Sequence, residues 1–109
     1  MILDTKSSAS FITKVSTISK ESNILVTTKL KVVLKDGFYF ITRRNKNSKW
    51  YNNLLVNNYA EIEINGEKRI AIAEEMVDEE EKKEVSAIKY SDERKEENRF
   101  GFKLRVKEV

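Results

Sequence analysis

The sequence of 109 residues contains no cysteine, histidine or proline and only three glycines. Without cysteine there are no disulfides, thiolate nucleophiles or zinc–thiolate sites. Without histidine there is no imidazole base, no serine triad of the usual kind and no histidine metal ligand. A calcium-loop pattern is also missing, so we expect no metal site. If the chain is an enzyme, a bound cofactor has to supply the difficult chemistry.

Long hydrophobic runs are missing as well. The longest, such as Val32–Leu34, are far shorter than the ~20 residues that a membrane helix needs. Met1–Lys6 lacks the apolar stretch of a signal peptide. The hydrophobic content of 39% is nevertheless too high for a disordered chain. We therefore expect one cytoplasmic domain over residues 1–109, away from membranes, in which residues 1–10 are a short N-terminal segment or disordered.

The formal net charge of +3 conceals an asymmetry between the two halves of the chain. Residues 1–58 hold ten Lys or Arg and three Asp or Glu, whereas residues 59–109 hold eleven and fifteen. A basic half predicts an anionic partner, such as a phosphate-bearing cofactor or a nucleic acid. A solvated surface in a Lys- and Glu-rich protein explains the same asymmetry equally well, and both interpretations stay open.

Alternation of apolar and polar residues predicts a chain of short strands. The clearest case is Ile24–Lys35, where every second residue is apolar or threonine and lysines occupy the opposite face. Asp36-Gly37 and Asn65-Gly66 are strong signals for two-residue hairpin turns. The strands expected from these patterns cover residues 11–18, 24–35, 38–43, 60–64, 68–77 and 99–109.

Two segments have helical spacing instead. In residues 48–58 apolar residues recur four apart, as Trp50 and Leu54 do, and Asn47 or Ser48 can cap the start. Asp78 begins a second helix with a capping-box pattern. Residues 91–98 are expected to be a charged loop or a fraying helix end.

The order of elements is therefore β-β-β-α-β-β-α-β. Tight hairpins exclude a parallel doubly wound sheet. Because each strand has one apolar and one polar face, we expect a mainly β fold with two short helices (β or α+β), in the form of a small antiparallel barrel with the helices packed at its ends.

The segment between the third strand and the first helix has the composition of a phosphate pocket. Helix N-termini attract anions through free N–H groups and the positive end of the helix dipole. Cations and hydroxyls gather within eight residues of this terminus, namely Thr42, Arg43, Arg44, Lys46, Ser48 and Lys49. An ordinary exposed basic loop is the alternative.

The same segment resembles a known family. Phe40-Ile41-Thr42-Arg43-Arg44, followed by Ser48-Lys49 and Asn53-Leu54, is similar to the "Y/F-x-T-R/N" strand and "S-x-K…N-L" helix of the flavin-binding split-barrel superfamily, typified by pyridoxamine 5′-phosphate oxidase. Val32–Lys35 resembles the family's "V-L-L-K" strand. Trp50–Leu55 is closer to the "W-Y-x-N-L" of the deazaflavin-dependent nitroreductase branch. The resemblance covers residues from about 11 to 109 in the right element order.

This resemblance implies a split barrel of the FMN-binding type, with FMN or a deazaflavin between the two subunits of a homodimer. Thr42, Ser48 and Lys49 match the family's phosphate-binding positions. Arg43 lies beside them, and Lys35 matches a further position that reaches the phosphate in the oxidase branch. No catalytic residue stands out. Oxidation of pyridoxamine phosphate itself is not expected, since the family's late histidine has no counterpart here.

The leading hypothesis is therefore a flavin-dependent oxidoreductase that acts on an unknown small molecule. A non-catalytic or vestigial flavin-binding module is one alternative. A small basic barrel that binds nucleic acid is another, although the aromatic residues of the last strand face away from its basic stripe of Arg99, Lys103, Arg105 and Lys107.

Overall fold

The computed structural model describes residues 8–90 and 99–107, and within them the expected order of elements is confirmed. The expected loop or helix end at 91–98, most of the N-terminal segment and the last two residues lie outside the described residues. The elements are β1 (Ala9–Ile18), β2 (Leu25–Lys35), β3 (Phe38–Arg43), α1 (Lys49–Val56), β4 (Tyr59–Ile64), β5 (Glu67–Glu75), α2 (Glu79–Lys89) and β6 (Phe100–Val106).

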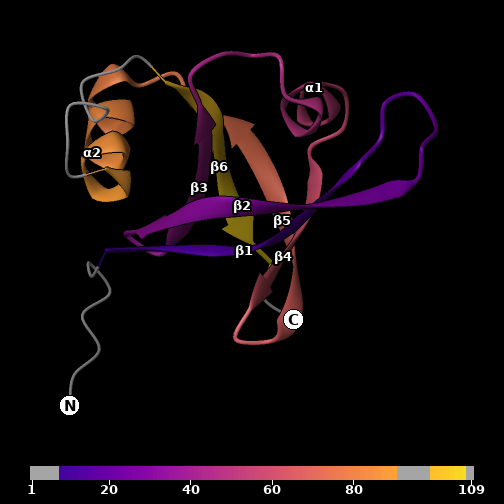
Figure 1. Cartoon of the computed structure of the whole chain (residues 1–109), viewed down its shortest axis with the longest axis horizontal. Coiled ribbons are helices and arrows are strands. Elements are labelled where there is room, and N and C mark those ends of the chain that lie inside the picture. The colour runs from indigo at the N-terminus through magenta and orange to yellow at the C-terminus, as the bar shows by residue number, and fades with distance from the viewer. Residues whose placement is uncertain (1–7, 91–98, 108–109) are drawn as a thin grey trace.

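The strands form a closed barrel in the order β1-β2-β3-β6-β5-β4, and every neighbouring pair is antiparallel (Figure 1). This confirms the predicted antiparallel barrel. Both predicted hairpin turns are present, because Asp36 and Gly37 have φ values of 53° and 83°, and Asn65 and Gly66 have values of 52° and 81°. Two consecutive positive φ values are those of a type I′ turn, whose twist matches that of the flanking strands.

Helix α1 closes one end of the barrel. Its residues Trp50, Tyr51 and Leu54 are buried in the same apolar cluster as Val32, Ile41 and other inward-facing strand residues. The hydroxyl of Tyr51 donates a hydrogen bond to Glu75 at the end of β5. Burial and this hydrogen bond raise the pKa of Tyr51, so the hydroxyl stays protonated. Trp50 and Tyr51 are therefore core residues.

Helix α2 does not pack at an end of the barrel, contrary to the sequence-based expectation. It covers the outer face of β2 and β3, where Val33 and Phe40 form a second apolar cluster with Met76, Val85 and Ile88. The reason is that these two strands carry apolar side chains on both faces and need cover outside as well as inside. Asp78 caps the helix by accepting from the N–H groups of Glu80 and Glu81.

Within the described part of the chain, no helix is long and apolar enough to span a bilayer. The same residues contain no group of three or more carboxylates arranged to hold a metal ion.

Strands β3 and β6 approach each other closely at Gly101, which pairs with Thr42. A Cβ atom on Gly101 would lie 2.1 Å from the carbonyl oxygen of Ile41 and 2.9 Å from the Cα atom of Thr42. These are backbone atoms, which cannot move aside without distorting the pairing. Glycine is therefore required here, and it fixes the position of Thr42.

We predict that Gly101→Ala lowers the free energy of unfolding by about 3 kcal/mol, at the upper end of overpacking costs. Gly37→Ala is the control, because a Cβ atom at this position would meet no atom within 4 Å. Only its positive φ disfavours alanine, and this strain costs about 1 kcal/mol. Urea denaturation of both variants measures the difference. Equal losses in the two would contradict the close approach of β3 and β6.

Candidate anion and cofactor site

Thr42, Arg43 and Ser48 come together where β3 ends and α1 begins. Thr42 is buried, whereas Arg43, the last residue of β3, is exposed. Ser48 occupies the N-cap position of α1, but its hydroxyl makes no capping bond. Instead it accepts a hydrogen bond of 3.1 Å from Nε of Arg43. Three of the five predicted phosphate residues therefore lie at one place, with a guanidinium held against a hydroxyl.

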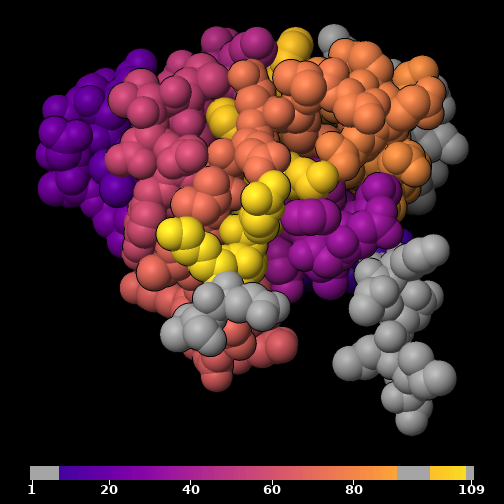
Figure 2. All heavy atoms as spheres, turned by 180° about the vertical axis from the view of Figure 1, so that it is seen from behind, coloured from indigo at the N-terminus to yellow at the C-terminus, as the bar shows by residue number. Residues whose placement is uncertain are grey.

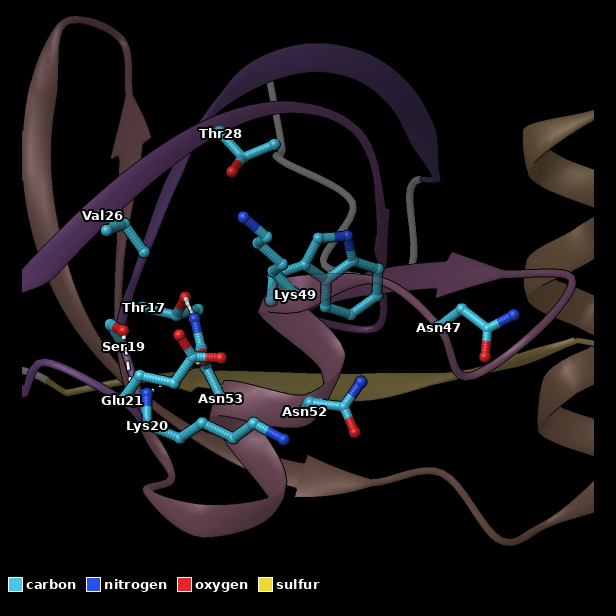
Figure 3. Close-up of a pocket in the computed structure, with 11 residues that line it drawn as sticks. Thr17, Ser19, Lys20, Glu21, Val26, Thr28, Asn47, Lys49, Asn52 and Asn53 are labelled. Carbon is cyan, nitrogen blue, oxygen red and sulfur yellow. Dashed lines mark hydrogen bonds between the residues drawn. The ribbon is translucent and has the colours of Figure 1, made fainter.

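Lys49, the first residue of α1, lines a groove of about 450 Å³ between this helix and the β1–β2 hairpin. In Figure 3 the side chain of Lys49 extends from α1 toward Thr28, and Asn52 and Asn53 belong to the same helix. The Asn53 amide is fixed by two bonds, since its Nδ2 donates to Oγ1 of Thr17 at 3.1 Å and its Oδ1 accepts from the backbone N–H of Lys20 at 3.1 Å. The groove is lined by Thr17, Ser19, Lys20, Glu21, Val26, Thr28, Asn47, Lys49, Trp50, Asn52 and Asn53.

A smaller pocket of about 150 Å³ lies between β2, β3 and the C-terminal end of α2. Trp50 lines both this pocket and the groove. The pocket is lined by Lys29, Leu30, Lys31, Ile41, Thr42, Arg43, Trp50, Lys89 and Tyr90.

Lys35, the fifth predicted residue, lies elsewhere. It pairs with Phe38, the first residue of β3, while Thr42 and Arg43 are the last. Its ammonium is 3.0 Å from a carboxylate oxygen of Asp36 and 3.7 Å from one of Glu84. The hydrogen bond to Asp36 raises the pKa of Lys35. The structure therefore does not bring Lys35 to the other four residues.

Lys89, the last residue of α2, was not among the predicted residues. It is only 8% exposed, and its Nζ donates to the backbone oxygen of Thr42 at 2.9 Å and to Oγ1 of Thr42 at 3.2 Å. Burial lowers its pKa to about 8, helped by the nearby charges of Arg99, Arg43 and Lys31. One signal was available, because Lys89 follows the core residue Val85 by four positions and so shares its helix face.

Further cations surround the end of β3. A second small pocket of about 190 Å³ is lined by Thr42, Arg43, Arg44, Asn45, Tyr90 and Arg99. Lys46 is directed elsewhere, with its ammonium 3.9 Å from a carboxylate oxygen of Glu75. The described residues that line the two small pockets include no carboxylate. The chemistry available at this place is anion binding.

Neither a protein-family model nor a curated protein matches the sequence. Solved structures do resemble the fold. General Stress Protein 26 from Bacillus anthracis has a TM-score of 0.67 and 14% identity, over 87% of this chain and 78% of that one. Rv2991, a conserved hypothetical protein from Mycobacterium tuberculosis, has a TM-score of 0.68 and 17% identity, over 89% and 73%. A proposed 5-nitroimidazole antibiotic resistance protein from Bacteroides thetaiotaomicron has a TM-score of 0.66 and 12% identity, over 94% of this chain and 86% of that one.

The chain folds as a small split β-barrel. At these identities the likeness is one of fold, and the function has to be argued from the residues of the site.

The lowered pKa of Lys89 makes stability depend on pH. Below about pH 8 the ammonium is charged in both the folded and the unfolded chain, so the folded state bears the full cost of burying it. Between about 8 and 10.5 the folded chain releases this proton while the unfolded chain keeps it. Stability contributed by this site therefore rises with pH across that interval.

We predict that the free energy of unfolding of the unmodified chain, relative to Lys89→Met, rises by roughly 1–2 kcal/mol between about pH 7 and pH 9.5. Urea denaturation at the two pH values measures it. Lys83→Met, on an exposed position of α2, is the control and should show no such rise. An identical pH response in both variants would contradict the shifted pKa.

Proposed function

We propose that this chain binds a flavin, FMN or alternatively a deazaflavin, and acts as an oxidoreductase on a small molecule. The observation that carries the proposal is the bonded pair of Arg43 and Ser48 at the N-terminus of α1, next to the groove that holds Lys49. The likeness to solved split barrels supports it, because the sequence resemblance is to flavin-binding members of that fold.

The donors at the start of α1 suit a phosphate monoester. A guanidinium and an ammonium supply positively charged donors, and the hydroxyl of Ser48 supplies a neutral donor whose bond is charge-assisted by the anionic acceptor. The Ser48 hydroxyl makes no bond to the helix backbone, and the first N–H groups of a helix favour an anion. Arg43, Ser48 and Lys49 would therefore hold the phosphate of the cofactor, with Thr42 buried behind them.

The groove suits the remainder of such a cofactor. Its volume of about 450 Å³ falls within the roughly 300–1,000 Å³ of small-molecule sites. Val26 and Trp50 offer apolar surface to a ring system, while Thr17, Thr28 and Asn53 offer hydrogen-bonding groups. When bound, a flavin supplies hydride or electron transfer. The chain's own residues bind and orient it and exclude water from one face.

A non-catalytic flavin-binding module is the second candidate. The sequence holds no histidine or cysteine to serve as an acid, base or nucleophile beside the cofactor. A nucleic-acid-binding barrel has less support, because cations of the β6 stripe are engaged with acids. Lys103 lies 3.3 Å from Glu81, and Arg105 lies 2.6 Å from Glu74.

The β1–β2 hairpin supports a homodimer. Strand β2 pairs with β3 only over Val33–Lys35, so within the described residues its edge from 25 to 32 has no second strand beside it. Ile24 and Leu25 are 61% and 42% exposed, and Figure 2 shows this end of the hairpin protruding at the opposite end of the molecule from α2. An exposed apolar edge of this kind is commonly covered by another chain. We propose a second copy as its occupant.

We predict that FMN binds at low micromolar concentration and that riboflavin, which lacks the phosphate, binds roughly ten- to a hundredfold more weakly. Fluorescence titration measures both affinities, and a deazaflavin is titrated alongside. Ser48→Ala and Lys49→Ala should each weaken FMN binding by roughly tenfold or more and leave riboflavin binding unchanged. Reduction of the bound flavin by a nicotinamide cofactor then distinguishes an enzyme from a passive module.

Lys68→Ala is the control for these titrations, because Lys68 lines a separate pocket beside β4 and carries the same charge. Unchanged FMN affinity in both Ser48→Ala and Lys49→Ala would move the phosphate away from α1. No binding of FMN or of the deazaflavin would reject the proposed function.

For the assembly, we predict that the chain sediments at twice its monomer mass and that the double variant Ile24→Lys/Leu25→Lys sediments as a monomer, since two charges would be desolvated in the interface. Sedimentation velocity measures this. Val77→Lys is the control, because Val77 is 81% exposed and lies before α2, away from the hairpin. A monomeric native chain, or a dimer unaffected by the double variant, would contradict the proposed interface.

A further inference from the structure

The small pocket between β2, β3 and α2 concentrates positive charge from three elements. Lys29 and Lys31 come from β2, Arg43 from β3 and Lys89 from α2. None of the described residues that line this pocket is acidic. Like charges that line one pocket repel each other, and the repulsion grows with burial because the local dielectric constant is low. The pocket therefore lacks a counter-charge among the described residues of its wall.

Lys89 is the innermost of these cations. Its ammonium has three N–H donors, of which two are used on Thr42, at its backbone oxygen and its Oγ1. The third N–H bonds to no other group in the described part of the chain. Burial together with Arg99, Arg43 and Lys31 lowers the pKa of Lys89 to about 8. An anion in the pocket would take the remaining donor and hold the lysine in its charged form.

Tyr90 offsets only part of this charge. Its ring lies 5.4 Å from the ammonium of Lys31, 5.5 Å from that of Lys89 and 4.6 Å from the guanidinium carbon of Arg99. A cation–π contact contributes about 0.5–2 kcal/mol, which is less than a full counter-ion contributes at the same distance. The aromatic ring forms a wall of the pocket and leaves room for an anion.

We propose that this pocket is a binding site for a phosphate group, with Lys89 as its charged floor and Lys31 and Arg43 at its rim. Lys31 and Arg43 are exposed and can close on a bound anion, whereas Lys89 and Thr42 are buried and fixed. A volume of about 150 Å³ admits one such group and excludes a whole cofactor. The group is free phosphate or the phosphate of the flavin. In the second case the inference rests on the proposed function and places that phosphate on the pocket side of Arg43, the cation that both sets of donors share, instead of beside Lys49.

The probe is inorganic phosphate, titrated into the whole chain at constant ionic strength and followed by calorimetry and by its phosphorus NMR signal. We expect saturable binding that Lys31→Ala and Lys89→Met each weaken roughly tenfold or more. Lys83→Ala, which removes the same charge from an exposed position on α2, should bind as the native chain does. Because Lys31 is exposed, its replacement tests the site even if Lys89→Met unfolds.

The pH dependence tests Lys89 specifically. The groups facing it are Lys31 and Lys29 on β2, Arg43 on β3, Tyr90 on its own element and Arg99 before β6. We expect phosphate affinity to fall severalfold between about pH 7.5 and pH 9.5, as the lysine loses its proton. Lys89→Arg keeps its charge throughout and should bind with a flatter pH profile.

Competition separates the two sources of the phosphate group. If FMN displaces inorganic phosphate, the pocket holds the flavin's own phosphate, and if both bind together it takes a separate anion. Phosphate binding without any flavin binding would sustain this site while rejecting the proposed function. No phosphate binding to the native chain, or the same affinity in Lys31→Ala as in Lys83→Ala, would overturn the inference, and so would a native pH profile in Lys89→Arg.

Discussion

The pairing of β3 with β6 is the constraint on which the rest of the structure depends. It joins the hairpin series β1-β2-β3 to the strands β6-β5-β4, and with the β1–β4 contact it closes the barrel. At Gly101 the two backbones are too close for any side chain. This close approach holds Thr42 in place, and Thr42 accepts both hydrogen bonds of the buried Lys89. The pairing of β3 with β6 thereby positions Thr42, on which the geometry of the anion pocket depends.

The two helices pack on different sides of the β3–β6 pair. Helix α1 closes the barrel end and brings Ser48 and Lys49 beside the last residues of β3, whereas α2 covers the outer face and brings Lys89 from the other side (Figure 1). Trp50 lines both the groove and the smaller pocket. Arg43 is common to both proposals, since it is bonded to Ser48 at the start of α1 and also lines the smaller pocket.

Most of the fold could be predicted from local patterns. Alternation gave the strands, Asp36-Gly37 and Asn65-Gly66 gave the turns, and Asp78 gave the start of α2, because each of these signals acts over a few neighbouring residues. The position of α2 was mispredicted. Its outward cover of Val33 and Phe40 depends on which strands carry apolar residues on both faces, and alternation alone does not reveal this.

The residues of the candidate site also fall into those that the sequence could group and those that it could not. Thr42, Arg43, Ser48 and Lys49 are near one another in the chain, so sequence sufficed to group them. Lys35 matched a family position, but it is the last residue of β2 and lies beside the start of β3, where its ammonium contacts Asp36 and Glu84.

Lys89 is 47 residues from Thr42 in the chain, and no local pattern connects the two. The sequence by itself therefore determined the strands, the turns and the basic loop, since these depend on short-range backbone preferences and side-chain periodicity. Only the tertiary structure decided which cations share a pocket, because charges distant in sequence meet only when the barrel closes and α2 packs against it.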